Sequence, residues 1–480
     1  MPRAIIFTEG GTQLGMGHLY RCAAYAEELA SSGWETAWRV CGDSLAQIFL
    51  SDRDSQLGAW HENEEATNKL EKFDLAIIDS YQASLNVYSR IADRVADCIY
   101  LDDWARLAYP KGYVVNCAPN AEKLPYILNK DTQLLLGSQY YALRKEFLEG
   151  FERAINPRIE KILIVMGATD LRNLSPEVLK IAHGNFPESE IRMVVSNELQ
   201  REKLALLENH QQKILGNRTA SEMRTLMEWA DICISAAGQT LYELCRMGLP
   251  TIAIGVADNQ RLNIEGFLEA EAILFAGWWD DKDLSQSLTG AFERIRLSSV
   301  RSGLMLKGQF LVGEGGCRRV LRAVFQKNVV IRKAVEADAS LLWRWRNSPE
   351  VRANSFATEP IPWKDHLGWF LRNLISPNAR IFVGQQSKGE AIGQVRFDLE
   401  DTGAVISISV DEAHRRRGLG EMLIRLGIKT FRQEFPTKPI TALIKKENIA
   451  SQSLFQRCGF QRVDTTEFNV SEYYRYQYER

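Results

Sequence analysis

The stretch Gly15-Met16-Gly17-His18-Leu19-Tyr20-Arg21-Cys22 decides the fold of the first part of the chain, because it joins a predicted strand to a predicted helix. Residues 4–8 are apolar and predict a short buried strand, and from His18 to about Ala30 small and apolar residues recur at helical spacing. Glycines let the backbone approach a ligand closely, and the first turn of a helix presents unpaired N–H groups to an anion. The sequence therefore predicts a strand, a glycine-rich turn and a helix that together bind an anionic group.

His18 is the residue of this stretch best suited to catalysis. The positive end of a helix disfavours the imidazolium form, so we expect a neutral ring that is able to take a proton from water. The alternative is that His18 only caps the helix or packs at its start. The glycines at positions 15 and 17, together with Arg21, favour the catalytic interpretation.

The composition is typical of a globular protein with several domains. At about 150 residues per domain, 480 residues predict roughly three domains. A net charge of -2 gives no basic surface for nucleic acid, and we expect no membrane insertion, because no apolar run approaches the roughly 18 residues of a membrane span. The eight cysteines are scattered without a C-x-x-C pair. Together with the absence of an apolar signal region, this favours a cytoplasmic protein with reduced thiols and no metal site.

Strand-like and helix-like runs alternate from residue 34 to about 150, which is typical of a parallel sheet covered by helices. Predicted strands at 75–79, 98–103 and 114–116 end in polar residues, where open α/β sheets bind ligands. Tyr81 is suited to donate a hydrogen bond to a sugar hydroxyl or to act as an acid. Asp102 and Asp103 are either site residues or plain loop acids, and the second interpretation is slightly favoured.

A second sheet is predicted after a helical, charged connector that reaches Ile159. Strand 161–166 runs into the turn 167–170, strand 231–235 into the turn 236–240, and strand 251–254 is followed by Asp258-Asn259-Gln260. One such turn is weak evidence, because any α/β protein has glycines after strands. Their order predicts two similar halves, each with a small-residue turn that faces the other across a cleft.

A different pattern begins near residue 329. A predicted strand at 329–334 is followed by a helix around 342–347, hairpin strands at 380–385 and 392–398, and a strand at 406–410. The turn Arg415-Arg416-Arg417-Gly418-Leu419-Gly420 then enters an apolar helix, and it offers successive N–H groups to a pyrophosphate. The alternative for its arginines is a solvated basic loop, which the glycines disfavour.

The motifs of residues 1–325 carry a resemblance to a known family. The half after residue 156 resembles the nucleotide-binding half of GT-B sugar-nucleotide enzymes. With the motif at 15–22, Asp79-Ser80-Tyr81 and Leu136 to Arg144, the chain resembles the UDP-sugar hydrolases of pseudaminic acid biosynthesis. That family cleaves UDP-2,4-diacetamido-2,4,6-trideoxy-β-L-altrose, and it usually carries Arg-x-Asp where this chain has Phe7-Thr8-Glu9, which keeps the carboxylate.

The resemblance implies roles for individual residues. His18 is the base that activates water against the anomeric carbon, Tyr81 assists at the sugar, UDP leaves, Gly238 holds the diphosphate and Glu243 the ribose. No metal is required, because helix N-termini stabilise the leaving diphosphate. The implied UDP-sugar-binding residues are Gly15, Gly17, Arg21, Asn116, Gly167, Asp170, Ala237, Gly238, Glu243, Asn259 and Gln260.

The last part of the chain, roughly 329–475, resembles the GNAT N-acetyltransferase superfamily. The turn at 415–420 is similar to its acetyl-CoA signature, and Asn448 with residues 454–460 is similar to its closing motif. The implied acetyl-CoA-binding residues are Val410, Arg415, Arg416, Arg417, Gly418, Leu419, Gly420 and Asn448. Phe455 stands where many members have a tyrosine acid, and the segment 345–352 resembles the acetyltransferase that acylates the 4-amino group in the same pathway.

Together these inferences predict an α/β protein with two Rossmann-like GT-B lobes, 1–155 and 156–326, followed by an α+β GNAT domain, 329–480. The predicted function is bifunctional: acetyl-CoA-dependent acetylation of a 4-amino UDP-sugar, then hydrolysis of the diacetamido product to free sugar and UDP. The alternatives are a GT-B glycosyltransferase that uses a UDP-sugar, or a nucleotide-sugar-binding scaffold joined to a protein N-acetyltransferase.

Overall fold

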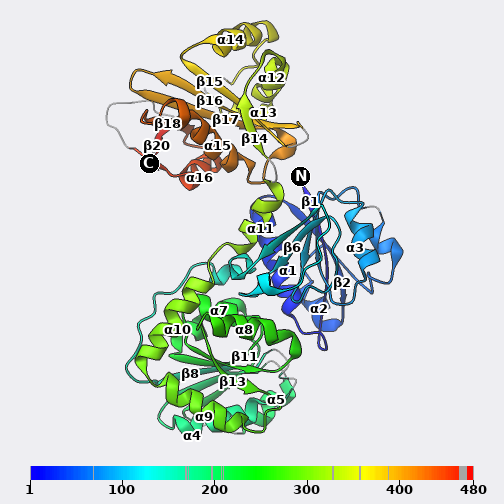
Figure 1. Cartoon of the computed structure of the whole chain (residues 1–480), viewed down its shortest axis with the longest axis vertical. Helices are drawn as coiled ribbons and strands as arrows, with labels where there is room; N and C mark the ends of the chain where they lie inside the picture. The colour runs from blue at the N-terminus through cyan, green and yellow to red at the C-terminus, as the bar shows by residue number, and fades with distance from the viewer. Residues whose placement is uncertain are drawn as a thin grey trace. The chain divides into compact units, whose positions relative to one another are not determined.

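The computed structural model describes residues 2–68, 70–167, 170, 172–195, 198–206, 208, 210–326, 329–355, 358–386, 389–463 and 473–478. The chain divides into two compact units, Met1–Val320 and Leu321–Arg480. Over the described residues the first unit holds two β-sheets and the second unit holds one (Figure 1). Within these ranges no helix has both the length and the apolar character needed to span a membrane.

The first sheet is entirely parallel, with the strand order β3-β2-β1-β4-β5-β6-β7. Its strands are β1 (Arg3–Gly10), β2 (Glu35–Gly42), β3 (Ser55–Leu57), β4 (Leu75–Asp79), β5 (Asp97–Leu101), β6 (Gly112–Asn116) and β7 (Thr132–Leu136). Its helices are α1 (Gly17–Ser31), α2 (Ser44–Phe49) and α3 (Leu85–Ala92). The order reverses between β1 and β4, and ligands of open parallel sheets bind at such a reversal, outside the carboxyl ends of the strands.

The second sheet repeats this design with the order β10-β9-β8-β11-β12-β13, again all parallel. Its strands are β8 (Lys161–Val165), β9 (Glu190–Val194), β10 (Gln212–Leu215), β11 (Ile232–Ala236), β12 (Thr251–Gly255) and β13 (Leu274–Trp278). The helices are α4 (Ser175–Asn185), α5 (Glu198–Ala205), α6 (Ala220–Trp229), α7 (Thr240–Arg246), α8 (Arg261–Glu269), α9 (Leu284–Ile295) and α10 (Ser298–Leu311), and the helix that follows them, α11 (Gly316–Phe325), pairs through Arg318 with Glu28 of α1. The predicted parallel sheets are therefore confirmed.

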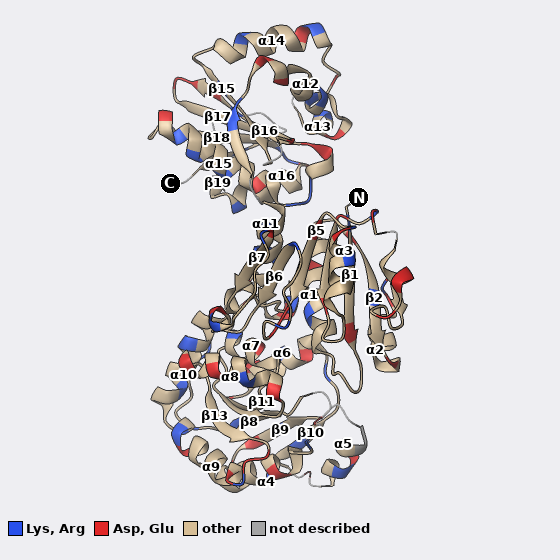
Figure 2. Cartoon of the chain, turned by 45° about the vertical axis from the view of Figure 1, so that its right-hand side comes forward, with Lys and Arg blue, Asp and Glu red and all other residues tan. Residues whose placement is uncertain are grey.

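Both faces of the second sheet are buried, which explains its nearly continuous apolar strands. Along β8, Ile162 and Ile164 join a core with α4 and α9, whereas Leu163 and Val165 join a core with α6, α7 and α8. The strand therefore carries apolar residues at successive positions rather than at alternate ones. Charged residues lie on the outside of the helices, with both signs interspersed (Figure 2).

The predicted helical connector after residue 147 is wrong, because residues 148–160 form no helix. The segment contains Gly150 and Pro157, both of which disfavour a helix interior. Arg153 instead donates hydrogen bonds of 2.5 Å each to the carbonyls of Met227 and Ala230 at the end of α6. This half-buried guanidinium holds the connector along the second sheet in an irregular conformation.

The two halves of the first unit are joined by specific contacts near the carboxyl ends of their strands. The rings of Tyr141, which follows β7, and Tyr242 on α7 stack with centroids 3.7 Å apart and an interplanar angle of 2°. Arg144 donates two hydrogen bonds, of 2.6 and 2.7 Å, to the carboxylate of Glu243. The first half therefore contacts the helix that opens after the second predicted turn.

The sheet of the second unit is mixed, with the order β14-β15-β16-β17-β18-β20-β19. Its strands are β14 (Val330–Lys333), β15 (Ala379–Gln385), β16 (Ala391–Glu400), β17 (Gly403–Val410), β18 (Ile440–Lys445), β19 (Phe460–Arg462) and β20 (Tyr473–Tyr478). Its helices are α12 (Ala339–Asn347), α13 (Pro349–Ala353), α14 (Trp363–Ile375), α15 (Leu419–Glu434) and α16 (Ile449–Arg457). β17 and β18 run parallel, and over the described residues they pair only at Ala404–Ile440 and Val405–Thr441, which leaves β17 without a strand partner on that side beyond residue 405.

Two glycines of α10 allow a test of how this helix packs against α7 in the first unit. A Cβ added at Gly303 meets no atom within 4 Å, whereas one added at Gly308 lies 3.3 Å from Cys245 on α7. Gly303→Ala should raise the free energy of unfolding of the first unit by about 0.5–1 kcal/mol through helix propensity. Gly308→Ala should gain less, because its methyl group crowds α7. Urea unfolding measures both, and an equal gain from the two variants would contradict the packing of α10 on α7.

Candidate functional site

A buried ionic cluster lies at the reversal point of the first sheet, where β1 and β4 end. Asp79, the last residue of β4, is fully buried, and its Oδ1 lies 2.7 Å from Nδ1 of His18. Arg21, one turn along α1, donates to both oxygens of Asp79 at 2.5 Å. The predicted site residues His18 and Arg21 are therefore brought together by Asp79, a residue with no predicted role of its own.

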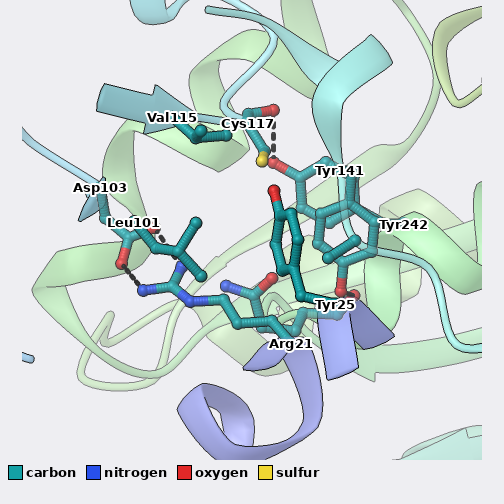
Figure 3. A pocket seen from close by; sticks show the side chains of 10 residues that line it. Arg21, Tyr25, Leu101, Asp103, Val115, Cys117, Tyr141 and Tyr242 are labelled. Atoms are coloured by element: carbon teal, nitrogen blue, oxygen red, sulfur yellow. Dashed lines mark hydrogen bonds and ion pairs between the residues drawn. The ribbon is translucent and has the colours of Figure 1, made fainter. Parts of the chain in front are cut away.

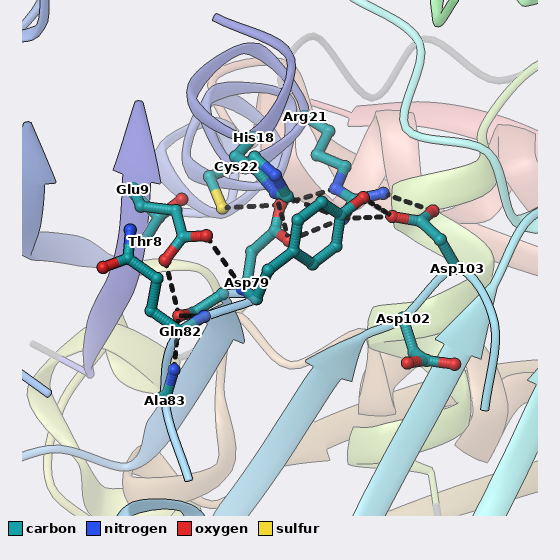
Figure 4. Close-up of polar contacts among 12 residues, drawn as sticks. Thr8, Glu9, His18, Arg21, Cys22, Asp79, Gln82, Ala83, Asp102 and Asp103 are labelled. Atoms are coloured by element: carbon teal, nitrogen blue, oxygen red, sulfur yellow. Dashed lines mark hydrogen bonds and ion pairs between the residues drawn. The ribbon is translucent and has the colours of Figure 1, made fainter. Parts of the chain in front are cut away.

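Asp103 extends the cluster (Figure 4), and Tyr81 joins it through Asp103. Arg21 donates to the two oxygens of Asp103 at 2.9 and 3.1 Å, and the Tyr81 hydroxyl donates to the same carboxylate. The Tyr81 ring lies edge-on to the His18 ring, with centroids 4.4 Å apart. Asp103, for which the interpretation as a plain loop acid was slightly favoured, is thus bonded to Arg21 and Tyr81 within the cluster.

Asp102, its neighbour, is a structural acid. Its carboxylate accepts hydrogen bonds from the hydroxyls of Tyr109 and Tyr126, both at 2.6 Å, and from the backbone N–H of Ala105 at 2.7 Å. The two adjacent acids therefore have different roles, because successive residues at the end of a strand point in different directions.

The charge on Asp79 determines which ring nitrogen of His18 carries a hydrogen. Burial raises the pKa of Asp79, but Arg21 and His18 outweigh it and lower the pKa to about 2. An ionised carboxylate only accepts hydrogen bonds, so Nδ1 of His18 carries a hydrogen, and in the neutral form of the ring the lone pair is on Nε2. Nη2 of Arg21, 3.4 Å from Nδ1, is then a close neighbour of the ring and not its hydrogen-bond donor.

Tyr81 keeps its proton at ordinary pH. Burial, followed by the negative charge of Asp103, raises its pKa far above the usual value. This disfavours the role of an acid, and because the hydroxyl already donates its single proton to Asp103, it offers a sugar hydroxyl only its acceptor lone pairs. Glu9, which is fully buried, holds this segment by accepting from the Ser80 hydroxyl at 2.6 Å and from the Tyr81 N–H at 2.8 Å.

The predicted glycine turns of the two halves face each other. Gly15 has a φ of 75°, and a Cβ at Gly17 would lie 3.6 Å from Cγ of Gln239 in the turn after β11. The hydroxyl of Tyr141 donates to the Gln239 carbonyl at 3.1 Å. The turns that contain Gly17 and Gly238 therefore meet, with neither helix N-terminus capped by a side chain.

Other predicted nucleotide-binding residues hold local structure. Asn116 is buried and donates to the Tyr126 hydroxyl at 2.9 Å, and Gln260 accepts from the N–H groups of residues 256 and 257. Asn259 lies exposed in the short 3-10 helix Asp258–Gln260. Glu243 is buried in its ion pair with Arg144, so a ribose hydroxyl at this carboxylate would share it with the guanidinium.

The turn after β8 is described only in part. Gly167 has a φ of 83°, and Asp170 accepts from the N–H groups of Leu174 and Ser175, both at 3.0 Å, at the start of α4. Ala168 and Thr169 lie outside the described residues. Asp170 therefore orders the start of a helix at the reversal point of the second sheet.

Two cavities lie in the first unit, and only the smaller one is lined by residues of the cluster. The smaller holds about 10 Å³, room for a single water, between Arg21, Asp103 and the tyrosines at 25, 141 and 242 (Figure 3). The larger holds about 310 Å³ and is lined by both halves of the first unit. Its walls include Tyr20, Phe49, Arg53, Arg144 and Arg218. Aromatic rings and guanidinium groups in one cavity suit a planar, anionic ligand.

The predicted turn at 415–420 lies beside the open edge of β17 in the second unit. Arg415 donates to the Val410 carbonyl at 3.0 Å, Arg416 has a φ of 62°, and Gly418 has a φ of 71° and precedes α15, which no side chain caps. Leu419 is buried, and a Cβ at Gly420 would lie 3.2 Å from Leu454 of α16. Arg417 belongs to the same turn. The turn therefore presents N–H groups at a helix N-terminus next to an unpaired strand edge.

The closing motif, Asn448 with residues 454–460, has a structural role in the second unit. Asn448 caps α16 by accepting from the Ser451 N–H at 3.0 Å. Phe455 is buried against Phe460, with ring centroids 5.0 Å apart, so it belongs to the core. A phenylalanine ring has no hydroxyl proton to donate, so Phe455 does not act as an acid. Among the residues that the structure describes, no three His, Cys, Asp or Glu side chains gather in a way that would hold a metal ion.

The comparisons with known proteins follow this division. The family model of the acetyltransferase (GNAT) domain matches residues 328–461. The second unit therefore carries a GNAT acetyltransferase domain. An uncharacterized protein of Methanocaldococcus jannaschii is 22% identical over 480 residues, which cover 95% of this chain and 96% of that protein.

Two further relatives match about half of this chain. One is a Helicobacter pylori protein named pseudaminic acid cytidylyltransferase and UDP-2,4-diacetamido-2,4,6-trideoxy-beta-L-altropyranose hydrolase, 26% identical over 256 residues, with 53% of this chain and 44% of that protein covered. The other is the spore coat polysaccharide biosynthesis protein SpsG of Bacillus subtilis, 23% identical over 285 residues, with 57% and 83% covered. The chain thus spans less than half the length of the Helicobacter relative.

The role of Asp79 in the cluster gives a pH-dependent prediction. Asp79→Asn should lower the free energy of unfolding at neutral pH by about 3–5 kcal/mol, because the buried Arg21 loses one of two carboxylates. The pKa of about 2 lies below the ordinary value of 3.8, so the stabilisation is present above about pH 4 and is lost as the pH falls toward 2.

The wild type and Asp79→Asn should therefore approach each other in stability, by about 2 kcal/mol, as the pH falls from about 5 to about 2. Urea unfolding at several pH values measures this, with the exposed Asp52→Asn as the control that should unfold like the wild type. A difference between wild type and Asp79→Asn that does not change with pH would show that Asp79 is not charged in the folded protein.

Proposed function

We propose that the first unit hydrolyses a UDP-linked sugar, with His18 as the base. The observation that carries this proposal is the 2.7 Å contact between His18 Nδ1 and the buried Asp79, at the reversal point of a parallel sheet. A histidine held in this way has a defined tautomer and orientation, as a general base requires. The facing turn at Gly238, just before the N-terminus of α7, supplies N–H groups for a nucleotide.

In the proposed reaction Nε2 of His18 takes a proton from a water molecule. The water oxygen attacks the anomeric carbon, the bond from that carbon to the phosphate oxygen breaks, and UDP leaves with the bonding electrons. The imidazolium that forms is stabilised by Asp79, since the cluster of Arg21 with Asp79 and Asp103 carries one excess negative charge. Backbone N–H groups at helix N-termini stabilise the charge that develops on the diphosphate.

The proposed substrate is UDP-2,4-diacetamido-2,4,6-trideoxy-altropyranose. The name of the Helicobacter relative includes this hydrolase activity, and the Bacillus relative is named for polysaccharide biosynthesis. In this proposal residues 1–155 and 156–326 are the two lobes of a GT-B fold, and 329–480 is the acetyltransferase domain. The duplicated parallel sheets with facing turns support that division.

The second unit, in the same proposal, acetylates the 4-amino group of the precursor UDP-sugar with acetyl-CoA. The residues present fit this cosubstrate. The turn at 415–420 offers N–H groups for its pyrophosphate, and the open edge of β17 beyond residue 405 offers backbone groups for its amide-containing arm. Acetyl-CoA supplies the acetyl group as a thioester. Acetylation and hydrolysis then follow each other on one sugar.

His18→Ala should lower the rate of UDP release from the diacetamido UDP-sugar by about 10²–10⁴-fold, the usual contribution of a general base. His183→Ala, which removes a half-buried histidine from α4, is the matched control and should leave the rate unchanged. UDP release is measured with a coupled assay and the sugar by mass spectrometry. Equal rates for wild type and His18→Ala would refute the role of His18.

An experiment with several 4-amino UDP-sugars separates the proposed bifunctional enzyme from the glycosyltransferase and scaffold alternatives. The protein is incubated with acetyl-CoA and several 4-amino UDP-sugars, and acetylated sugar and free UDP are followed by mass spectrometry. We expect an N-acetylated UDP-sugar first and free sugar with UDP afterwards. Turnover only with an added sugar acceptor would indicate a glycosyltransferase, and acetylation of peptide N-termini without UDP release would indicate the scaffold alternative.

A further inference from the structure

An exposed tryptophan lies directly beside the buried ionic cluster of the first unit. Trp104 follows Asp103 at the carboxyl end of β5, and its side chain is 39% exposed. Its ring lies against the ring of Tyr81, with centroids 4.5 Å apart and the two planes tilted by 44°. Tyr81 in turn lies edge-on to His18. The indole is therefore the exposed end of a row of three rings that begins at the proposed base.

The turn that carries Trp104 is held in a conformation that an alanine rarely adopts. Ala105 has a φ of 59°, which lies in the left-handed region. The carboxylate of Asp102 accepts hydrogen bonds from the N–H of Ala105 at 2.7 Å and from the N–H of Arg106 at 3.3 Å. Such conformations persist only where the surrounding structure determines them, and they cluster at functional sites. The position of the indole is therefore fixed by its own turn.

A second set of contacts ties this turn to the turn after β4. The guanidinium of Arg106 donates to the carbonyls of Ser80 and Ala83, at 3.0 and 2.9 Å. The turn after β4 also carries Tyr81, the residue on which the indole packs. The turns that contribute the two rings are thus bonded to each other, so Trp104 is presented in one orientation before any ligand binds.

The indole and the cluster beside it suit different parts of one ligand. Ligands of open parallel sheets bind outside the carboxyl ends of the strands, and both turns lie there. The face of a tryptophan is large and apolar, so it binds apolar groups, whereas the cluster offers carboxylates and a guanidinium. Ring contacts of 4.4 and 4.5 Å separate His18 from Trp104 through Tyr81, a span that one pyranose ring with its substituents can bridge.

We propose that Trp104 determines the sugar specificity of the hydrolysis, and that its ring receives the apolar part of a deoxy sugar, the methyl group at C6 with the adjoining C–H groups of the pyranose. The inference rests on the hydrolysis proposed above and names the feature of the sugar that is recognised. A hexose that keeps its C6 hydroxyl would bring a polar group onto the indole, and a buried polar group without a partner costs free energy.

Two substrates that differ only at C6 test this assignment in the full chain. They are the UDP-linked 2,4-diacetamido-2,4,6-trideoxy sugar and its 6-hydroxy analogue, and kcat/KM is measured for each from UDP release. Wild type should prefer the deoxy sugar, and Trp104→Leu should reduce that preference about 10-fold, the discrimination that one methyl group in an apolar pocket provides. Trp104→Phe keeps an aromatic face and should keep most of the preference. A wild type without any preference would contradict the assignment.

A purely structural role of Trp104 predicts a different result. If the indole only supported Tyr81, Trp104→Leu would slow the hydrolysis of both sugars by the same factor, and the unchanged preference would overturn the proposal. The matched control is Trp363→Leu, because Trp363 on α14 of the second unit is 40% exposed and its loss should leave both rates unchanged. Trp104→Leu should bind UDP alone as tightly as the wild type does. Weaker binding of UDP would assign the indole to the nucleotide and reject its role at the sugar.

Failure of the proposed hydrolysis is distinguishable from failure of this assignment. If the wild type releases no UDP from either sugar nucleotide, the hydrolysis is rejected, and calorimetry with the same two compounds tests the indole by itself. Weaker binding of the deoxy sugar nucleotide to Trp104→Leu, with unchanged binding of UDP, would keep Trp104 as the residue that recognises the sugar. Equal binding of the deoxy sugar nucleotide by the wild type and Trp104→Leu would refute that role.

Discussion

The burial of the Asp79 carboxylate is the constraint on which the first unit depends. A charge removed from water must be paired and hydrogen-bonded, and Asp79 is fully buried at the end of β4. It therefore fixes His18 and Arg21 on α1, and Arg21 in turn fixes Asp103 after β5. Three segments that are far apart in the sequence are held together by one interaction. The same interaction gives His18 a single tautomer, so the stability of the fold and the orientation of the proposed base have one cause.

The second sheet completes the site through contacts of a different kind. The stacked rings of Tyr141 and Tyr242, and the ion pair of Arg144 with Glu243, join the two halves close to the glycine turns. These contacts involve α7, which begins directly after the turn that holds Gly238. Any nucleotide that enters between the turns therefore meets residues that also hold the halves together. The guanidinium of Arg144 and the proposed ribose would therefore compete for the carboxylate of Glu243.

The sequence predicted the parallel sheets well, because strands buried on both faces read as short apolar runs, such as 75–79, which matches β4 residue for residue. It also predicted that polar residues gather at strand ends. The connector at 148–160 could not be predicted, since its conformation depends on where Arg153 finds carbonyl partners on α6. The different roles of Asp102 and Asp103 could not be predicted for a similar reason. Two adjacent acids look alike in the sequence, and they differ only in which side chains the fold brings close to each of them.

The two units also differ in how their buried polar groups are satisfied. In the first unit Asp79, Asp103, Arg21 and Tyr81 satisfy one another, which rigidifies the site before any substrate binds. In the second unit Gln394 and Ser409 leave buried atoms unpaired. A general base requires a fixed orientation in advance.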